Sequence, residues 1–421
     1  MNQRATTGAH ADATTGATPE FEPDVMDLLV EALRGAVKRE SPAVGTDTVL
    51  AALVMGDTDA GAAIAPGMRA AGALSGVISG RAGRGWASDD EGATASDATD
   101  ADALEVDTAW REAQWRLSLG SRGSGARSEL PRLGMTGALR TCLLLALVSA
   151  RAEGTISVRC RHVARALVDL PGGTAREALL LRGLDPATAA TALDALNAGA
   201  PAQGEGPESR GVTLLRRAGT LGSSGNRLAR AITSWTSGVA QNGSPVLFAV
   251  SVEAVRQAVR RGHTEAGPVD LLLGMLALDR ALAVAGRSLP EDLTKANAAA
   301  PLLRRYGVRQ TSLTRAAVTS PPVAGAAEIT DIADVRISAA ADRAMAVARL
   351  TAAEHGSPTV GTVHLLAALL GGATEPTAEA GPGTEDVGAV VRLLRASGEV
   401  DTAGLRAELR LQLGRVTRAA A

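Results

Sequence analysis

Apolar and polar residues recur with helical spacing along most of the chain, and one pattern occurs four times. In each copy two apolar helices follow one another, separated by a short break that contains glycine. The second helix of the pattern reads VGTDTVLAALV from Val44, VRCRHVARALV from Val158, AGPVDLLLGML from Ala266 and VGTVHLLAALL from Val360. A repeat of this kind buries its apolar face by packing on a neighbouring copy. The pattern therefore predicts an all-α protein built from paired repeats.

The fourth copy indicates most clearly where its helices begin and end. Ser338 is placed to cap the first helix through its hydroxyl, and small apolar residues follow at helical spacing. Gly356 and Pro358 end that helix, and Thr362 is expected to cap the second one. The buried stripe of the second helix is expected to comprise Leu365, Leu366, Leu369 and Leu370. Asp401 is expected to cap the last helix of the copy.

The other three copies align with the fourth without a gap, from the first cap to the apolar second helix. Pro23, Thr136 and Ser244 open their first helices, and Thr46 is expected to cap the second helix of the first copy. The repeats are expected at about 21–78, 133–197, 242–318 and 335–414. The chain then divides into a disordered tail at 1–20, a first domain at 21–198, a linker at 199–241 and a second domain at 242–415. Each domain would be a pseudo-two-fold pair of about four-helix repeats.

Composition agrees with helices and limits the partners. Aromatic residues make up 2% of the 421 residues, so the core has to be built from Ala, Leu and Val. A formal net charge of −2 does not favour nucleic acid or an anionic membrane as a partner. The longest apolar run, CLLLALVSA from Cys142, is too short to span a bilayer, and residues 1–20 lack the apolar core of a secretory signal. We expect a cytoplasmic protein.

An acidic insert at 87–130 separates the first two repeats. Residues 87–107 carry eight acidic side chains and no basic one, which is typical of solvated disorder. A short amphipathic helix is expected at 108–119, capped by Asp107 and carrying Trp110 and Trp115. We favour an interpretation in which this helix docks on its own domain. The alternative is a tethered partner-binding motif with an acidic lead-in.

Motifs for catalysis, nucleotides and metals are missing from the sequence. Neither the phosphate-binding motif G-x-x-x-x-G-K-[ST] nor the hydrolase motifs G-x-S-x-G and H-E-x-x-H occur in it. Cys142 and Cys160 have no metal-ligand spacing around them, and we expect two reduced thiols. His162 and His364 are interpreted as half-buried histidines at a helix start, bonded to backbone or a neighbouring loop. We therefore predict no enzyme, no cofactor and no metal site.

The four copies resemble the N-terminal repeat domain of Clp ATPases, the Hsp100 unfoldases, which is a tandem of two four-helix repeats. VGTVHLLAALL at 360–370 and the downstream GEVDTAGL from Gly398 carry the resemblance most specifically. The resemblance covers most of the chain, but no ATPase motif accompanies it. It therefore implies a stand-alone tandem Clp N-domain protein that lacks the ATPase modules.

In some relatives the repeat domain is a receptor for phosphorylated arginine, and one Thr and one Glu of the repeat help to form the pocket. The resemblance places these two positions, copy by copy, at Glu22 and Asp47, Thr136 and Arg161, Ser244 and Val269, and Ser338 and Val363. No copy keeps both residue types: Arg161 would repel a guanidinium, and Glu22 would repel a phosphate. We expect no intact phosphoarginine pocket and interpret Thr136, Ser244 and Ser338 as helix caps.

These features bear on three classes of function. The favoured one is a non-catalytic protein- or peptide-binding module of the Clp protease–chaperone system: an adaptor, decoy or substrate-recognition protein. Its partner would be a Clp ATPase or the substrates of one. The second is a small-molecule sensor that captures a peptide antibiotic and so protects a Clp unfoldase. The third, a peptidase, has the least support because the sequence offers no nucleophile–base pair.

Overall fold

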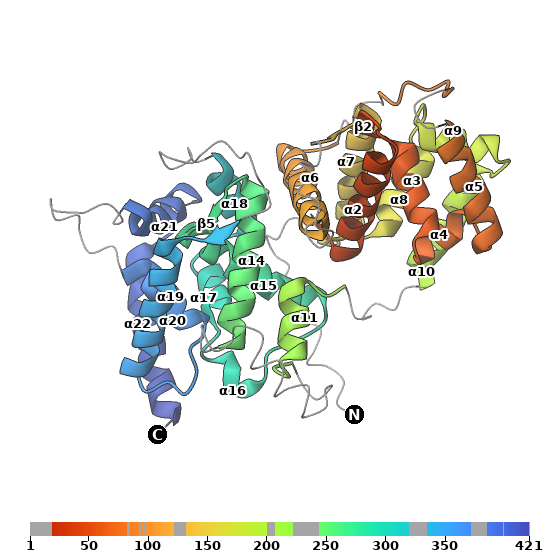
Figure 1. Cartoon of the computed structure of the whole chain (residues 1–421). Helices are drawn as coiled ribbons and strands as arrows, with labels where there is room; N and C mark the ends of the chain where they lie inside the picture. The colour runs from red at the N-terminus through yellow and green to blue at the C-terminus, as the bar shows by residue number, and fades with distance from the viewer. Residues whose placement is uncertain are drawn as a thin grey trace, which may run out of the picture. The chain divides into compact units, whose positions relative to one another are not determined.

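The computed structural model describes residues 19–81, 85–91, 95, 97–121, 132–199, 207–221, 244–319, 335–371, 385–398 and 400–420. This part of the chain is largely helical, and its strands are only two residues long, so the prediction of an all-α fold is confirmed. The chain divides between Gly204 and Glu205 into two compact units (Figure 1). Each unit has a hydrophobic core of its own.

Unit 1 contains two sets of four helices and four short strands. The first set is α2 (Pro23–Lys38), α3 (Thr46–Met55), α4 (Asp59–Ile64) and α5 (Gly67–Arg81). The second set is α7 (Gly137–Ala152), α8 (Cys160–Asp169), α9 (Thr174–Leu181) and α10 (Pro186–Gly199). The strands are β1 (Glu20–Phe21), β2 (Ala43–Val44), β3 (Gly134–Met135) and β4 (Ser157–Val158). A further helix, α6 (Asp100–Ser121), lies between the two sets in sequence.

Two parallel strand pairs join the repeats of unit 1 crosswise. β1 precedes α2 and pairs with β4, which precedes α8, with Glu20 opposite Ser157. β2 precedes α3 and pairs with β3, which precedes α7, with Ala43 opposite Gly134. The start of the first helix of one repeat therefore meets the start of the second helix of the other repeat. This arrangement gathers helix N-termini into two junctions.

Among its described residues, unit 2 follows a similar plan, with five helices in its first set and four in its second. Its first set comprises α14 (Pro245–Arg261), α15 (Pro268–Val284), α16 (Glu291–Thr294), α17 (Ala299–Arg305) and α18 (Gln310–Thr319). Its second set comprises α19 (Ala339–Glu354), α20 (Thr362–Gly371), α21 (Glu385–Ala396) and α22 (Thr402–Ala420). The strands β5 (Glu265–Ala266) and β6 (Arg336–Ile337) pair in parallel, as β2 and β3 do in unit 1. One more helix, α11 (Arg210–Arg217), precedes these sets.

The preference of Ser and Thr for helix N-caps correctly predicted where the first helix begins in the second, third and fourth repeats. The hydroxyls of Thr136, Ser244 and Ser338 each accept a hydrogen bond from the backbone three residues later, as predicted. Asp401 caps α22, and its carboxylate accepts from the Gly404 amide at 2.8 Å. Gly154, Gly262 and Gly356 end the first helices in the left-handed conformation, with φ of 71°, 81° and 59°. The four leucines of the predicted α20 stripe are all buried.

The prediction of solvated disorder at 87–107 was wrong for residues 100–107, which form the first turns of α6; residues 92–94 and 96 lie outside the described part. α6 begins at Asp100, and the predicted cap Asp107 lies inside the helix, where it forms an ion pair with Arg140. Trp110 is buried in the core of unit 1, and its indole N–H donates to the carbonyl of Leu133 at 3.1 Å. The interpretation that this helix docks on its own unit is therefore confirmed. Its apolar stripe at 106, 109, 110, 113 and 117 outweighs the acidic composition of the segment.

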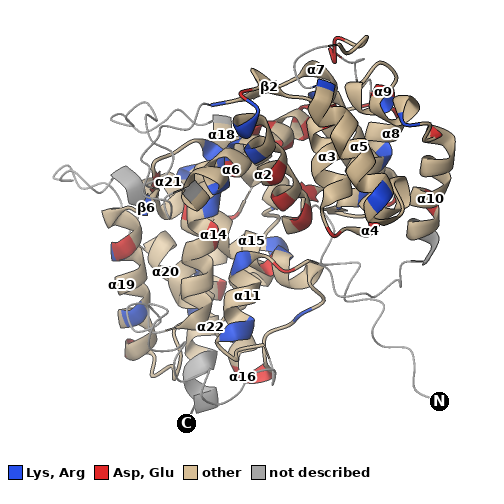
Figure 2. Ribbon diagram, turned by 45° about the vertical axis from the view of Figure 1, so that its right-hand side comes forward, with Lys and Arg blue, Asp and Glu red and all other residues tan. Residues whose placement is uncertain are grey.

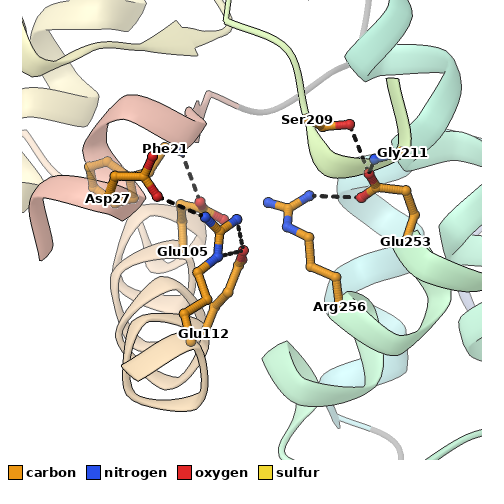
Figure 3. Close-up of polar contacts among 9 residues, drawn as sticks. Phe21, Asp27, Glu105, Glu112, Ser209, Gly211, Glu253 and Arg256 are labelled. Carbon is orange, nitrogen blue, oxygen red and sulfur yellow. Dashed lines mark hydrogen bonds and ion pairs between the residues drawn. The ribbon is translucent and has the colours of Figure 1, made fainter. Parts of the chain in front are cut away.

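Part of the predicted linker at 199–241 is also folded. Val212 and Leu215 of α11 are fully buried in the core of unit 2. The carboxylate of Glu253 on α14 accepts from the Ser209 hydroxyl at 2.8 Å and from the Gly211 amide at 3.3 Å (Figure 3). Among the described residues, α11 is therefore the first helix of unit 2, and α6 holds a comparable place against α2 in unit 1.

The start of unit 1 also differs from the prediction. Pro19 and Glu20 are buried, and Glu20 belongs to β1, so the unit begins within the predicted tail; residues 1–18 lie outside the described part. Charged positions of both signs are interspersed along the helices (Figure 2). Within the described residues, no helix combines the length and the apolar character that crossing a bilayer requires.

Candidate binding site at the helix junctions

A buried carboxylate fills the junction of β2 and β3 in unit 1. Asp90 is only 5% exposed. Its Oδ2 accepts from the amide of Thr46 at 3.0 Å and from the hydroxyl of Thr136 at 2.6 Å. Its Oδ1 accepts from the hydroxyl of Thr46 at 2.6 Å and from the amide and hydroxyl of Thr174 at 2.9 and 3.1 Å. We call these donors of Thr46, Thr136 and Thr174 the seat.

The seat is suited to an anion because it gathers the N-termini of three helices. Thr46 begins α3, Thr174 begins α9, and Thr136 caps α7. Free backbone amides and the helix dipole both favour negative charge at such ends. Charge-assisted hydrogen bonds to the carboxylate add to this preference. The arrangement therefore binds a carboxylate strongly without any basic side chain among its donors.

Asp90 reaches the seat from an irregular segment, residues 85–91, which we call the strap. The carbonyl of Asp90 accepts from the amide of Ala138 at 2.9 Å. Farther along, the carboxylate of Glu177 accepts from the amides of Ala87 and Ser88 at 2.9 and 3.0 Å. Asp90 has a φ of 57°, in the left-handed region that Asp tolerates better than most residues. The strap is thus bonded through its backbone to the first turn of α7 and to a side chain of α9.

Glycine makes room for the strap at two positions of the seat. A β-carbon at position 137 would collide with the carbonyl oxygen of Glu91. A β-carbon at position 45 would lie 2.6 Å from Oδ1 of Asp47 and 3.0 Å from Oδ2 of Asp90. The strap backbone therefore requires glycine at 137, whereas at 45 the two carboxylates together leave no room for a side chain.

The structure brings predicted site residues together across repeats and not within one repeat. Thr136 of the second copy and Asp47 of the first copy lie at the same junction, because Thr174 accepts from the Asp47 amide at 3.2 Å and donates to Asp90. Burial raises the pKa of the Asp47 carboxyl, and the neighbouring charge of Asp90 raises it further. The copy-by-copy pairing of the sequence analysis missed this, since strand pairing between repeats places the helix starts.

The second junction of unit 1 lies at β1 and β4 and holds Glu22 and Arg161. The amide of Glu22 donates to the carbonyl of Val158 at 3.0 Å, and the residue is buried. Arg161 forms an ion pair with Glu153 at 2.6 Å. The carboxylate of Asp24 accepts from the Cys160 amide at 3.2 Å and so occupies the start of α8. A carboxylate of the chain itself thus fills this helix end too.

In unit 2, Val269 and Ser338 lie at the β5–β6 junction. The Ser338 amide donates to the carbonyl of Ala266 at 3.0 Å. Val269 packs against the core and offers no polar group. The start of α15 is filled by its own Asp270, which accepts from the Gly267 amide at 2.9 Å and pairs with Arg261 at 2.8 Å.

The two remaining predicted positions, Ser244 of the third copy and Val363 of the fourth, are not joined by any hydrogen bond among the described residues. Ser244 caps α14. Val363 is fully buried, and its amide donates to the carbonyl of Ala296 at 3.0 Å. The amide of Thr362 donates to Oδ1 of Asn297 at 3.0 Å, so the start of α20 is also filled from within the chain.

Thr46 and Thr362 do not cap their own helices as predicted. Each is the first residue inside its helix, and its hydroxyl serves a distant helix instead. Thr46 Oγ1 accepts from the Ala175 amide of α9 at 3.0 Å. Thr362 Oγ1 accepts from the Ala299 amide of α17 at 3.4 Å. A local capping rule could not find these contacts because the partners are 129 and 63 residues away.

The two histidines at helix starts are bonded to backbone as predicted, but they are fully buried. Nδ1 of His162 accepts from the Arg159 amide at 2.8 Å, and its Nε2 lies 3.0 Å from Glu153. Nδ1 of His364 accepts from the Gly361 amide at 3.0 Å, whereas its Nε2 has no hydrogen-bond partner among the described residues. Burial lowers the pKa of His364 to about 4.

The remaining candidates offer no reactive group. Cys142 and Cys160 are free and buried, and burial raises the pKa of both thiols. Trp115 is half-buried on α6. Over the described ranges, no group of three or more His, Cys, Asp or Glu side chains is placed to hold a metal ion.

Comparison of the chain with protein-family models, with curated proteins and with solved structures finds no match. The family resemblance therefore depends on the sequence motifs, and the candidate site depends on the geometry of the junctions.

Proposed function

We propose that this chain is a non-catalytic protein- or peptide-binding module of the Clp protease–chaperone system, acting as an adaptor, decoy or substrate-recognition protein. The four motif copies support the link to Clp proteins. The observation that carries the proposal is the seat of unit 1, where an acidic peptide segment is held between two repeats by backbone amides and hydroxyls. A site that holds one such segment has the chemistry to hold another.

The state of the usual catalytic groups supports a binding role. Both cysteines are buried, with raised thiol pKa values, so they form the reactive thiolate poorly. The buried histidines use one ring nitrogen as an acceptor for a backbone amide, which fixes them as structural groups. These features favour recognition over chemistry.

The proposal is tested with the tagged full chain as bait in a native lysate, followed by mass spectrometry and by direct titration against a purified Clp unfoldase. We expect the unfoldase or its substrates to be enriched over an unrelated helical bait of similar size. Binding of neither would contradict the proposal. The bait retains residues 87–130, because their deletion would remove helix α6, whose apolar side chains are buried in unit 1.

A further inference from the structure

The strap is held by polar contacts, by the buried side chain of Asp90 and by one aromatic contact. Of residues 85–91, only Asp90 is buried; Trp86 is half-buried, packs against the core of unit 1 and has Arg81 5.9 Å from its ring centroid. Segments that bury few apolar groups open at a low free-energy cost compared with the global unfolding of the core. The helices around the seat are packed into the core of unit 1 by their own leucine, valine and alanine side chains. The strap can therefore leave while these helices stay folded.

In unit 2 a side chain of the neighbouring helix start fills the place that Asp90 fills in unit 1. The hydroxyl of Thr46 accepts from the Ala175 amide, and the hydroxyl of Thr362 accepts from the Ala299 amide, so the two sites are equivalent. Gly173 precedes Ala175 by two residues, as Asn297 precedes Ala299, so Gly173 corresponds to Asn297. In unit 2 the Asn297 side chain accepts from the first amide of α20.

In unit 1 the equivalent residue, Gly173, has no side chain, and Asp90 accepts from the first amide of α3 instead. A β-carbon at position 173 would lie 3.3 Å from Thr46 Oγ1 and 3.8 Å from Asp90 Oδ1, so a side chain there would point at the seat. The carboxylate that fills the seat thus comes from Asp90, which lies 84 residues from Thr174 in the sequence.

We infer that the strap is a built-in occupant of the seat and that an acidic segment of a partner protein displaces it. The seat favours a carboxylate over an amide, because its five donors all point at the two oxygens of Asp90. It also requires an accessible backbone carbonyl at the acidic residue, which takes the Ala138 amide. The strap thereby keeps the site closed until a competing segment arrives. This inference rests on the proposed function and names its ligand class.

The test uses a fluorescent peptide with the sequence of residues 85–92, GWASDDEG, titrated against the full chain by anisotropy. Asp90→Gly removes the carboxylate of the strap and leaves every donor of the seat in place. We expect this variant to bind the peptide about tenfold or more tightly than the wild type, because the strap no longer competes. Asp89→Gly, which changes an exposed neighbour, should behave as the wild type.

Two further comparisons locate the binding. A peptide with Asn in place of the second Asp should lose binding to the Asp90→Gly variant. Adding Gly173→Asn should also abolish binding, because it supplies the side chain that Asn297 supplies in unit 2. The backbone of Gly173 has a φ of −80°, which a non-glycine residue adopts without strain.

Several outcomes would overturn the inference. One is a folded Asp90→Gly variant that binds the peptide no better than the wild type, and another is binding that survives Gly173→Asn. If Asp90→Gly does not fold, Gly173→Asn in the wild-type chain should still release the strap and speed amide exchange at Ala87 and Ser88; unchanged exchange would overturn the inference. Peptide binding without any captured protein would count against the proposed function alone. Capture unaffected by Gly173→Asn would count against this inference alone.

Discussion

At the scale of single residues, Asp90 has the largest role and was the hardest to find from sequence. It stands in an acidic run whose composition is typical of disorder. Its donors lie 44, 46 and 84 residues away, beyond the reach of any local rule. Thr136, Ser244 and Ser338 were predictable, by contrast, because a cap bonds to a backbone amide three residues later.

Replacement of Asp90 should destabilise unit 1. Asp90→Ala leaves the amides of Thr46 and Thr174 and three hydroxyls without their shared acceptor, and we expect a loss of about 3 kcal/mol in the free energy of unfolding. Asp89→Ala removes an exposed carboxylate and should change stability by less than about 0.5 kcal/mol. Urea denaturation followed by circular dichroism measures both. Equal effects of the two substitutions would contradict the role assigned to Asp90.

The buried His364 makes unit 2 sensitive to acid. Its pKa is lowered to about 4 in the folded state from 6.5, so between these values the unfolded chain binds a proton that the folded chain does not. Stability therefore falls as pH falls from about 6.5 to 4, by on the order of 2 kcal/mol. The contribution is fully retained above pH 6.5. Urea midpoints of unit 2 at pH 7 and pH 4.5 measure the difference.

His355→Glu should reduce this acid sensitivity. Glu153 and His162 in unit 1 have the same spacing as His355 and His364 in unit 2. Glu153 lies within hydrogen-bond distance of Nε2 of His162, whereas Nε2 of His364 has no such partner among the described residues. A glutamate at 355 would accept from that nitrogen and raise the pKa of His364. His355→Ala is the matched control, since it removes the neighbouring imidazole without adding an acceptor. A similar acid response in the Glu and Ala variants would contradict the account.

At the scale of elements, the helix pairs were predictable and the two additional helices were only partly so. The apolar stripes of α3, α8, α15 and α20 repeat along the chain, and all four helices were found near their predicted positions. α6 was found but placed too short, because its first turns are acidic. α11 was assigned to a linker because it has only eight residues within a glycine-rich stretch. Its buried residues, Val212 and Leu215, lie three apart, which is too brief a pattern to define a helix.

α11 should contribute to the stability of unit 2. Leu215 is fully buried, and we expect Leu215→Ala to lower the free energy of unfolding by about 3 kcal/mol. Leu214 is adjacent but half-buried, so Leu214→Ala should cost clearly less. Chemical denaturation of the full chain, with the transition of unit 2 resolved, gives both values. If α11 were an unpacked linker, both variants would unfold with the free energy of the wild type, and that result would contradict the prediction.

At the scale of the whole molecule, each unit has a complete core that shares no residue with the other. We expect fragments 18–204 and 205–421 to fold separately, each with a single cooperative transition by circular dichroism. The transition of each fragment should coincide with one in the full chain. A fragment that is helical but melts without cooperativity would show that its unit depends on the other.

The central claim, that the seat of unit 1 binds acidic segments, is tested most directly by amide hydrogen exchange of the wild-type full chain with and without excess GWASDDEG peptide. We predict that the peptide speeds exchange at Ala87 and Ser88 in the released strap. The amides of Thr46, Thr174 and Ala138 should stay protected, because the peptide replaces Asp90 as their acceptor. Absence of saturable peptide binding to the wild type, or strap exchange that is unchanged at saturation, would contradict the claim.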